Sequence, residues 1–239
     1  MMHKKKYNKF MEVSIILPTY NEKYNIFLLV NSIKKYLKKY SLEIIIVDDN
    51  SPDSTGNHCL KKFSKDKSVK VILNKKRIGF SESIFKGIQN STKKNLVIMD
   101  TDFTHDPILI PKMLRLLNEY EIIIGSRYCV GGYMQDHVHS RLSYLYNLLL
   151  KIILKTQVQD NLGGYFCISK KSLNRLPKKK IFYGYGEYFF RLLFYALKIN
   201  LTVLEIPAIY KKRIRGKSKS KFIYMFYKYF LEALKLRLS

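Results

Sequence analysis

Two carboxylates two residues apart, Asp100 and Asp102, are the residues of this chain best placed to do chemistry. They follow the apolar run 96–99, which has the length of a strand buried on both faces, and open parallel sheets bind ligands at the carboxyl ends of their strands. Mg²⁺ and Mn²⁺ take hard oxygen ligands and neutralise the charge that develops on a leaving diphosphate. The pair therefore predicts a metal site for a nucleotide diphosphate, although Asp-x-Asp pairs also occur by chance in loops and helix caps.

Other apolar runs of the sequence end in polar residues in the same way. The run 44–47 leads into Asp48 and Asp49, and the run 13–17 leads into the segment Pro-Thr-Tyr-Asn-Glu. Helical spacing of apolar residues follows, and a further strand (69–73) and helix (82–89) continue the alternation. This order predicts an α/β fold with a mainly parallel central sheet and helices on both faces. A doubly wound domain with acidic caps and no catalysis is the alternative.

Five segments in a fixed order carry a resemblance to a known family. They are Pro18-Thr19-Tyr20-Asn21-Glu22, Val47-Asp48-Asp49-Asn50-Ser51, the run from Asp100 to Pro107, Gly125-Ser126-Arg127-Tyr128, and Arg213-x-x-Gly216-x-Ser218-Lys219. In order and spacing they are similar to the family 2 inverting glycosyltransferases, and among these to dolichol-phosphate mannose synthases and other polyprenyl-phosphate glycosyltransferases. The match runs from about residue 13 to residue 221. It implies the Rossmann-like GT-A fold and sugar transfer from a nucleotide with inversion.

The resemblance also implies the donor side of the site. Asp100 and Asp102 would bind Mg²⁺ or Mn²⁺, with Thr104 or water as the third ligand. The positions implied to line the nucleotide-sugar pocket are Pro18, Tyr20, Glu22, Asp49, Gly79 and Asp100. Ser81 and Ser83 stand where relatives usually carry glycine and alanine, which puts phosphate and base contacts of the segment 79–87 in doubt.

The acceptor side can be argued from charge. A lipid phosphate approaches a donor diphosphate only if cations screen the two anions. The family's phosphate-binding positions are matched by Arg127, Arg141, Arg213 and Lys219, of which Arg141 rests on spacing alone. A solvated surface cation is the alternative for each in a chain with 44 lysines and arginines. With Asp102, the cations Arg127, Arg213 and Lys219 form the expected catalytic set.

The segment 160–166 resembles the family's glycine-containing segment near the sugar and the acceptor, with Gly163 and Tyr165 in place of serine and phenylalanine. Its glycines permit close backbone approach. An acceptor phosphate is already largely ionised at neutral pH, so no strong base is required. Catalysis would rest on alignment and on stabilisation of the leaving diphosphate. Glu187 either positions the site or is an acid at a helix N-terminus.

Length and composition predict one domain of two lobes. A chain of 239 residues with 47% hydrophobic content can form one sizeable core. We expect a basic flexible arm (1–11), a catalytic domain (12–221) with a nucleotide-sugar lobe (12–128) and an acceptor lobe (129–221), and an amphipathic helix (222–239). The formal net charge of +26 implies an anionic partner, either a membrane or nucleic acid. Three widely spaced cysteines fit neither a zinc site nor a disulfide framework and favour a reducing compartment.

Two segments bear on the membrane. The apolar segment 142–154 is too short to span a bilayer and either packs on the core or meets a membrane surface. In the helix predicted at the C-terminus, one face is polar, with Lys221, Tyr224, Lys228, Glu232, Lys235 and Ser239, and the other is apolar, with Phe222, Met225, Phe226, Tyr229, Phe230, Ala233 and Leu234. Preceded by a basic run, this helix is expected to bind a membrane surface or a membrane subunit, with packing on the core as the alternative. We therefore predict a peripheral protein on the cytosolic face of a membrane, the endoplasmic reticulum in a eukaryote or the cell membrane in a prokaryote.

Three classes of function are compatible with these features. The leading one is metal-dependent transfer of a hexose, with mannose from GDP-mannose favoured, to a polyprenyl phosphate such as dolichyl phosphate. Its partners would be the nucleotide sugar, the lipid, an anionic membrane and small membrane subunits, with no nucleic acid. Another family 2 reaction, with UDP-glucose as donor or a hydroxyl as acceptor, is the alternative. A non-enzymatic nucleic-acid binder would explain the charge but not the strands that end in acidic residues.

Overall fold

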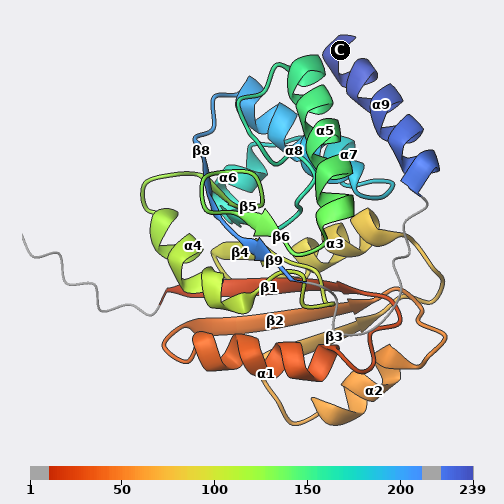
Figure 1. Ribbon diagram of the computed structural model, residues 1–239. Helices are drawn as coiled ribbons and strands as arrows, with labels where there is room; N and C mark the ends of the chain where they lie inside the picture. The colour runs from red at the N-terminus through yellow and green to blue at the C-terminus, as the bar shows by residue number, and fades with distance from the viewer. Residues whose placement is uncertain (1–10, 212–221, 239) are drawn as a thin grey trace, which may run out of the picture.

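The computed structural model describes residues 11–211 and 222–238, and within them seven strands form one sheet (Figure 1). The order of the strands is β3 (Val69–Leu73), β2 (Ser41–Asp48), β1 (Glu12–Thr19), β4 (Asn95–Ile98), β7 (Phe166–Ser169), β5 (Ile122–Ser126) and β8 (Val203–Pro207). Neighbours are parallel except for β7, which runs antiparallel to both β4 and β5. The predicted mainly parallel α/β sheet is confirmed, whereas the predicted arm 1–11 lies outside the described residues apart from Met11.

Helices connect these strands. They are α1 (Ile26–Tyr36), α2 (Thr55–Lys62), α3 (Phe80–Gln89), the 3₁₀ turn η1 (Pro107–Leu109), α4 (Ile110–Leu116), α5 (His137–Leu154), α6 (Lys170–Asn174), α7 (Lys178–Ile181), α8 (Glu187–Lys198) and α9 (Phe222–Leu238). The short strands β6 (Tyr133–Met134) and β9 (Ile209–Tyr210) form a separate parallel pair. The helix α1 shows why such segments fold this way, because Ile26, Leu29, Val30 and Ile33 recur at helical spacing and are all buried on one face.

Successive side chains along each strand point to opposite faces of the sheet, and this divides the core into two layers. In β1, Ile15 and Leu17 pack with α1 and α4, whereas Ile16 packs on the other side of the sheet with α3 and α8. Ser14, a buried polar residue between apolar neighbours, donates a hydrogen bond to the Glu43 carboxylate. Helices therefore cover both faces, as predicted, and strands buried on both faces explain the continuous apolar runs in the sequence.

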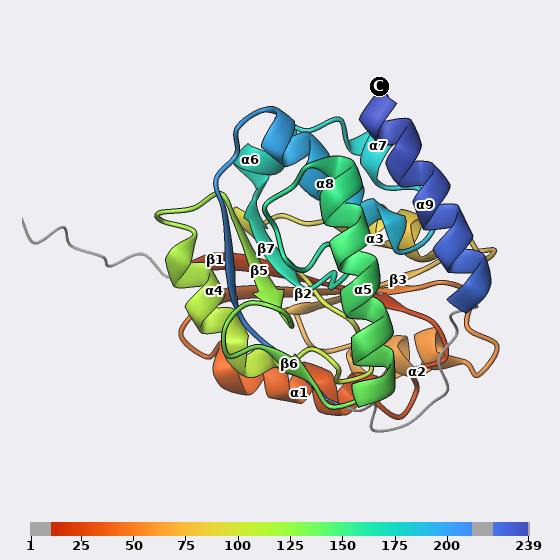
Figure 2. The same cartoon turned by 45° about the horizontal axis from the view of Figure 1, so that its top comes forward.

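The helices α5 and α9 lie side by side in both views (Figures 1 and 2). A third cluster joins Tyr146 and Leu150 of α5 to Tyr229 and Ala233 of α9 and to α8. The segment 142–154 thus packs on the protein along one side. Its other side is exposed through Leu142, Tyr144, Leu145, Leu148 and Ile152. Among the helices of residues 11–211 and 222–238, none has the length and hydropathy to cross a bilayer.

The C-terminal helix forms as predicted, but it is rotated relative to the prediction. Lys228 and Glu232, expected on the outer polar face, instead form ion pairs with α8. Phe226 and Leu234, expected on the opposite face with the buried Tyr229, are 45% and 36% exposed. The periodicity of the sequence predicts a helix, but it does not reveal the buried charged residues of α8 that pair with the helix and orient it. The predicted assignment of its polar and apolar faces was therefore wrong.

Candidate active site

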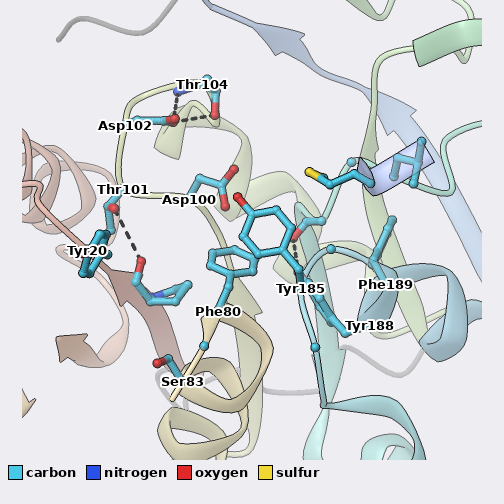
Figure 3. A pocket seen from close by; sticks show the side chains of 18 of the residues that line it. Tyr20, Phe80, Ser83, Asp100, Thr101, Asp102, Thr104, Tyr185, Tyr188 and Phe189 are labelled. Carbon is cyan, nitrogen blue, oxygen red and sulfur yellow. Dashed lines mark hydrogen bonds between the residues drawn. The ribbon is translucent and has the colours of Figure 1, made fainter. Parts of the chain in front are cut away.

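The carboxyl ends of three parallel strands meet at one edge of the sheet. Thr19 at the end of β1 is in register with Asp48 at the end of β2, and Asp100 follows the end of the adjacent β4. Open parallel sheets bind ligands at this position. A cavity of about 510 Å³ opens there (Figure 3). All residues predicted for the donor side line it, namely Pro18, Tyr20, Glu22, Asp49, Gly79, Asp100, Asp102 and Thr104.

The loop after β4 holds the two carboxylates in place. The Asp100 backbone N–H donates to Nδ1 of His105 over 2.9 Å. Oδ1 of Asp102 accepts hydrogen bonds from the hydroxyl of Thr104 at 2.7 Å and from its backbone N–H at 3.1 Å. Phe103 adopts a φ of +66°, a left-handed conformation that bulky residues rarely take. This tight turn places both carboxylates at the cavity, as Figure 3 shows.

The donor set of this loop fits a divalent metal that is shared with a diphosphate. Asp100 and Asp102 offer carboxylate oxygens, the hard ligands that Mg²⁺ and Mn²⁺ take. In residues 11–211 and 222–238 no group of three or more His, Cys, Asp or Glu side chains could hold a metal alone. The chain would thus supply two carboxylates, and diphosphate oxygens and water the remaining positions. The Thr104 hydroxyl orients Asp102, and its direct role as a ligand stays a prediction.

His105 lies buried behind this loop. Its ring stacks on Tyr165 with centroids 4.7 Å apart and meets Tyr210 edge-on, also at 4.7 Å. Burial lowers the pKa of His105 to about 4, so the ring is neutral at physiological pH. Because Nδ1 accepts the Asp100 N–H, the proton of the neutral ring resides on Nε2. A histidine with a fixed tautomer therefore supports the Asp100 backbone.

Asp49 organises another side of the cavity. Its Oδ1 accepts hydrogen bonds from the Ile78 N–H at 2.8 Å and from the Asn74 side-chain amide at 3.0 Å, and its Oδ2 accepts from the Gly79 N–H at 3.0 Å. Gly79 has a φ of +112°, which requires glycine. Asp49 thus holds the 74–79 loop at the cavity, and any contact it makes with a nucleotide adds to that structural role.

A flat cation–aromatic pair lines the same pocket. The Arg77 guanidinium lies 4.1 Å from the centroid of the Tyr20 ring, and 61% of the Arg77 side chain is exposed. A planar guanidinium on an aromatic ring offers a stacking surface suited to a nucleotide base. Sequence reasoning singled out Tyr20 but missed Arg77. Its only signal was a basic run at 75–77, two residues before Gly79.

Arg127 lines the cavity just after β5, where its guanidinium pairs with Asp160. Nε and Nη2 of Arg127 donate to the two Asp160 oxygens at 2.8 and 2.7 Å, and the Arg127 backbone N–H donates at 3.0 Å. Burial opposes ionisation of Asp160, but the adjacent guanidinium outweighs it and lowers the pKa of that carboxyl. The predicted phosphate-binding cation is therefore not a solvated surface charge, because a buried carboxylate compensates it.

Part of the cavity wall is aromatic. Tyr146 of α5 and Phe226 and Tyr229 of α9 line it, and the Tyr146 hydroxyl donates to the Phe226 carbonyl at 2.7 Å. Tyr185 lies against Phe80 with ring centroids 5.5 Å apart, and Figure 3 shows both rings close to Asp100. One cavity thus has acidic residues on one part of its wall and aromatic residues from α5 and α9 on another.

The family model for glycosyl transferase family 2 matches residues 14–176. The chain belongs to this family. A dolichol-phosphate mannosyltransferase of Pyrococcus furiosus is 32% identical over 217 residues, which are 88% of this chain and 60% of that protein. An undecaprenyl-phosphate mannosyltransferase of Micrococcus luteus is 28% identical over 215 residues, 87% of each chain. This family 2 chain therefore spans about 60% of the length of the archaeal relative.

A solved structure supports the fold of this family 2 chain. Glucosyl-3-phosphoglycerate synthase from Mycobacterium tuberculosis, in complex with Mn²⁺, UDP and phosphoglyceric acid, superposes with a TM-score of 0.73 at 17% identity. The likeness covers 95% of this chain and 78% of that one. The GT-A fold and the glycosyltransferase family predicted from the sequence are confirmed.

The remaining acceptor-side predictions have different outcomes. Arg141 of α5 is exposed and lines a shallow hollow together with Arg127, Tyr128 and Tyr144, so the structure brings two of the four predicted cations to one place. Arg213 and Lys219 lie outside the described residues. The phosphate-binding role of all four stays a prediction.

Ser83 and Glu22, two further predicted positions, have hydrogen-bond partners. Ser83 lines the cavity, and its hydroxyl accepts a hydrogen bond from the Asn74 amide at 3.3 Å, whereas Ser81 is fully buried. Oε2 of Glu22 accepts from the Asn25 amide at 2.7 Å directly before α1. These contacts build the walls of the pocket, and they neither require nor exclude contact with a ligand.

Proposed function

We propose that this chain is a metal-dependent inverting glycosyltransferase that transfers a hexose, with mannose from GDP-mannose favoured, to a polyprenyl phosphate such as dolichyl phosphate. The observation that carries the proposal is one cavity lined both by Asp100 and Asp102 and by the aromatic side chains of Tyr146, Phe226 and Tyr229. The carboxylates suit a metal-bound diphosphate, and an aromatic wall between two helices suits the apolar part of a lipid acceptor. The polyprenyl phosphates in the names of two relatives support the same acceptor class.

The reaction is a displacement at the anomeric carbon of the sugar. An oxygen of the acceptor phosphate forms a bond to this carbon on the face opposite the nucleotide, and the bond from the carbon to the diphosphate oxygen breaks. Configuration is inverted, and the nucleoside diphosphate leaves with the electron pair. The acceptor oxygen is already ionised, so no side chain has to remove a proton. A bound Mg²⁺ or Mn²⁺ would supply charge stabilisation for the diphosphate.

The side chains of the cavity would bind and orient the two substrates. Tyr20 and Arg77 offer the stacking surface for the base, and the loop fixed by Asp49 lies beside it. Asp100 and Asp102 would hold the metal–diphosphate. Arg127, held in place by Asp160, lines the cavity and would offer its remaining N–H groups to the acceptor phosphate. Alignment of the phosphate with the sugar is then the main contribution of the protein.

We also propose that the protein works at the cytosolic face of a membrane, bound peripherally. The outward sides of α5 and α9 carry exposed apolar residues, among them Leu145, Ile152, Tyr227, Leu231 and Leu238. Lys235 and Arg237 lie in the last turn of α9, where they would meet anionic headgroups. Small membrane subunits are the alternative partners of these sides.

The test is transfer of radiolabelled sugar to dolichyl phosphate in detergent. GDP-mannose and UDP-glucose are compared as donors, with Mn²⁺ or with EDTA. Lipid labelling from GDP-mannose that EDTA abolishes is the expected result. Labelling from UDP-glucose alone would change the donor, and labelling of a sugar hydroxyl acceptor but not of the lipid would reject the polyprenyl phosphate.

A further inference from the structure

The loop immediately before α8 (the 183–186 loop) lines the cavity, and carboxylates from two helices hold its backbone. Glu82 of α3 accepts a hydrogen bond from the Gly184 N–H at 2.9 Å. Glu187, the first residue of α8, accepts one from the Tyr185 N–H, also at 2.9 Å. Hydrogen bonds to carboxylates, rather than pairing in a β-sheet, therefore fix the backbone in this part of the cavity wall.

A buried arginine of α8 also holds the backbone near this loop. Arg191 is fully buried, and its Nη1 and Nη2 donate to the backbone carbonyls of Ile181 and Tyr183 at 2.8 and 2.9 Å. Its guanidinium lies 3.4 Å from the centroid of the Tyr183 ring. Two carboxylates compensate its charge, Glu232 of α9 at 3.3 Å and Glu187 at 3.7 Å. A buried charge of this kind destabilises the fold unless such partners compensate it, so the network is sensitive to the loss of any of them.

The helix α9 takes part in this network through three successive contacts. Lys228 Nζ lies 2.7 Å from Oε1 of Glu187, which is 1% exposed. The Tyr183 hydroxyl donates to Glu232, one helical turn further along. Between these two residues, Tyr229 packs so closely on Gly186 that a Cβ there would overlap its hydroxyl. The position of α9 and the conformation of the loop are therefore fixed together.

We propose that Lys228 and Glu187 are positioning residues, whose ion pair locks α9 against the 183–186 loop and so sets the width of the cavity between Tyr185 and the α9 residues Phe226 and Tyr229. The inference rests on the proposed function and deepens it, because this is the part of the wall that would hold the apolar acceptor. Neither residue needs to touch the reacting atoms. Glu187 fixes the Tyr185 backbone, and Lys228 ties that carboxylate to the helix.

The kinetic test compares Lys228→Met with Lys198→Met, an exposed lysine at the end of α8. Lys228→Met should raise KM for dolichyl phosphate about fivefold, the scale of a half-exposed ion pair, and leave kcat and the KM for the nucleotide sugar within about twofold. Lys228→Arg should restore the wild-type KM, and Lys198→Met should not change it. Equal effects of the two methionine variants, or a loss confined to kcat, would overturn the proposal.

A second measurement needs no substrate and separates this inference from the proposed function. Hydrogen exchange of the Tyr185 amide, which Glu187 protects, should accelerate about fivefold in Lys228→Met and not in Lys198→Met, with global unfolding unchanged in both. Unaltered Tyr185 exchange in Lys228→Met overturns the coupling. Faster exchange in a protein whose wild type transfers no sugar to lipid would support the coupling and reject the proposed acceptor. Lys228→Gln serves as a second variant if the methionine protein fails to fold.

Discussion

The guanidinium of Arg127 and the carboxylate of Asp160 form a two-point ion pair in which 8% and 0% of the respective side chains are exposed. The pair joins the end of β5 to the segment that precedes β7, so it fixes one wall of the cavity. Two opposite charges that are buried together in good geometry compensate each other, whereas either one buried alone destabilises the fold.

Asp160→Asn should therefore destabilise the fold by about 3–5 kcal/mol at neutral pH, because it leaves the buried Arg127 uncompensated. The pKa of Asp160 is lowered in the folded state, so its contribution is present above the ordinary value of 3.8 and is lost as pH falls through the folded value. Urea unfolding across pH measures this. Glu12→Gln, at a surface ion pair with Lys94, is the control and should cost under about 1 kcal/mol. A neutral-pH cost for Asp160→Asn as small as that of the control would contradict the assignment.

His105 predicts a pH dependence of the same sign, but in a higher pH range. Burial lowers its pKa from 6.5 to about 4. Between these pH values His105 therefore binds a proton in the unfolded chain but not in the folded chain. Stability should thus be full above pH 6.5 and fall between pH 6.5 and 4, by about 3 kcal/mol in total. His105→Asn keeps an acceptor for the Asp100 N–H and should remove this slope, whereas the exposed His58→Asn should retain it. A slope that survives in His105→Asn would show that another group causes it.

Asp102→Asn should weaken Mn²⁺ binding in the presence of GDP by more than about tenfold, because an amide oxygen replaces a carboxylate ligand. The fold should persist, since the amide oxygen can still accept from Thr104. Electron paramagnetic resonance of free Mn²⁺ gives the affinity without any turnover. Asp106→Asn is a control from the same loop, because Asp106 caps η1 and pairs with Lys211 outside the cavity lining. Equal affinities of the two variants would remove Asp102 from the metal site.

Membrane binding by α9 can be followed with a single fluorophore, since the chain contains no tryptophan. Tyr227 is 64% exposed on α9, and Tyr227→Trp should shift its emission to the blue on addition of anionic vesicles. Added salt should reverse the shift in part, because screening weakens the attraction of basic residues to the lipid surface. Tyr24→Trp, at a position 69% exposed before α1, should not respond. Equal shifts at the two positions would indicate non-specific adsorption.

The sequence predicted well which carboxylates meet at the edge of the sheet, because its signals there are local. Asp100 and Asp102 follow a strand directly, and neighbouring parallel strands bring Asp49 to the same edge. It could not predict that Asp160 is the partner of Arg127, since no periodicity connects residues so far apart in the chain. The support of Asp100 by His105 depends equally on tertiary packing. The prediction of which side of α9 faces outward failed for the same reason, because Lys228 pairs with a carboxylate of another helix.

The antiparallel strand β7 has a consequence for the order in which the protein forms on the ribosome. The strands β1 to β4 pair only with one another and with β7, so the edge that carries Asp49 and Asp100 can assemble soon after β4 has been synthesised. β5 can pair only after its two neighbours in the sheet, β7 and β8, have been synthesised. A nascent chain halted after β5 would therefore carry the edge with Asp49 and Asp100 but no Asp160, so Arg127 would lack its counterion until translation resumes.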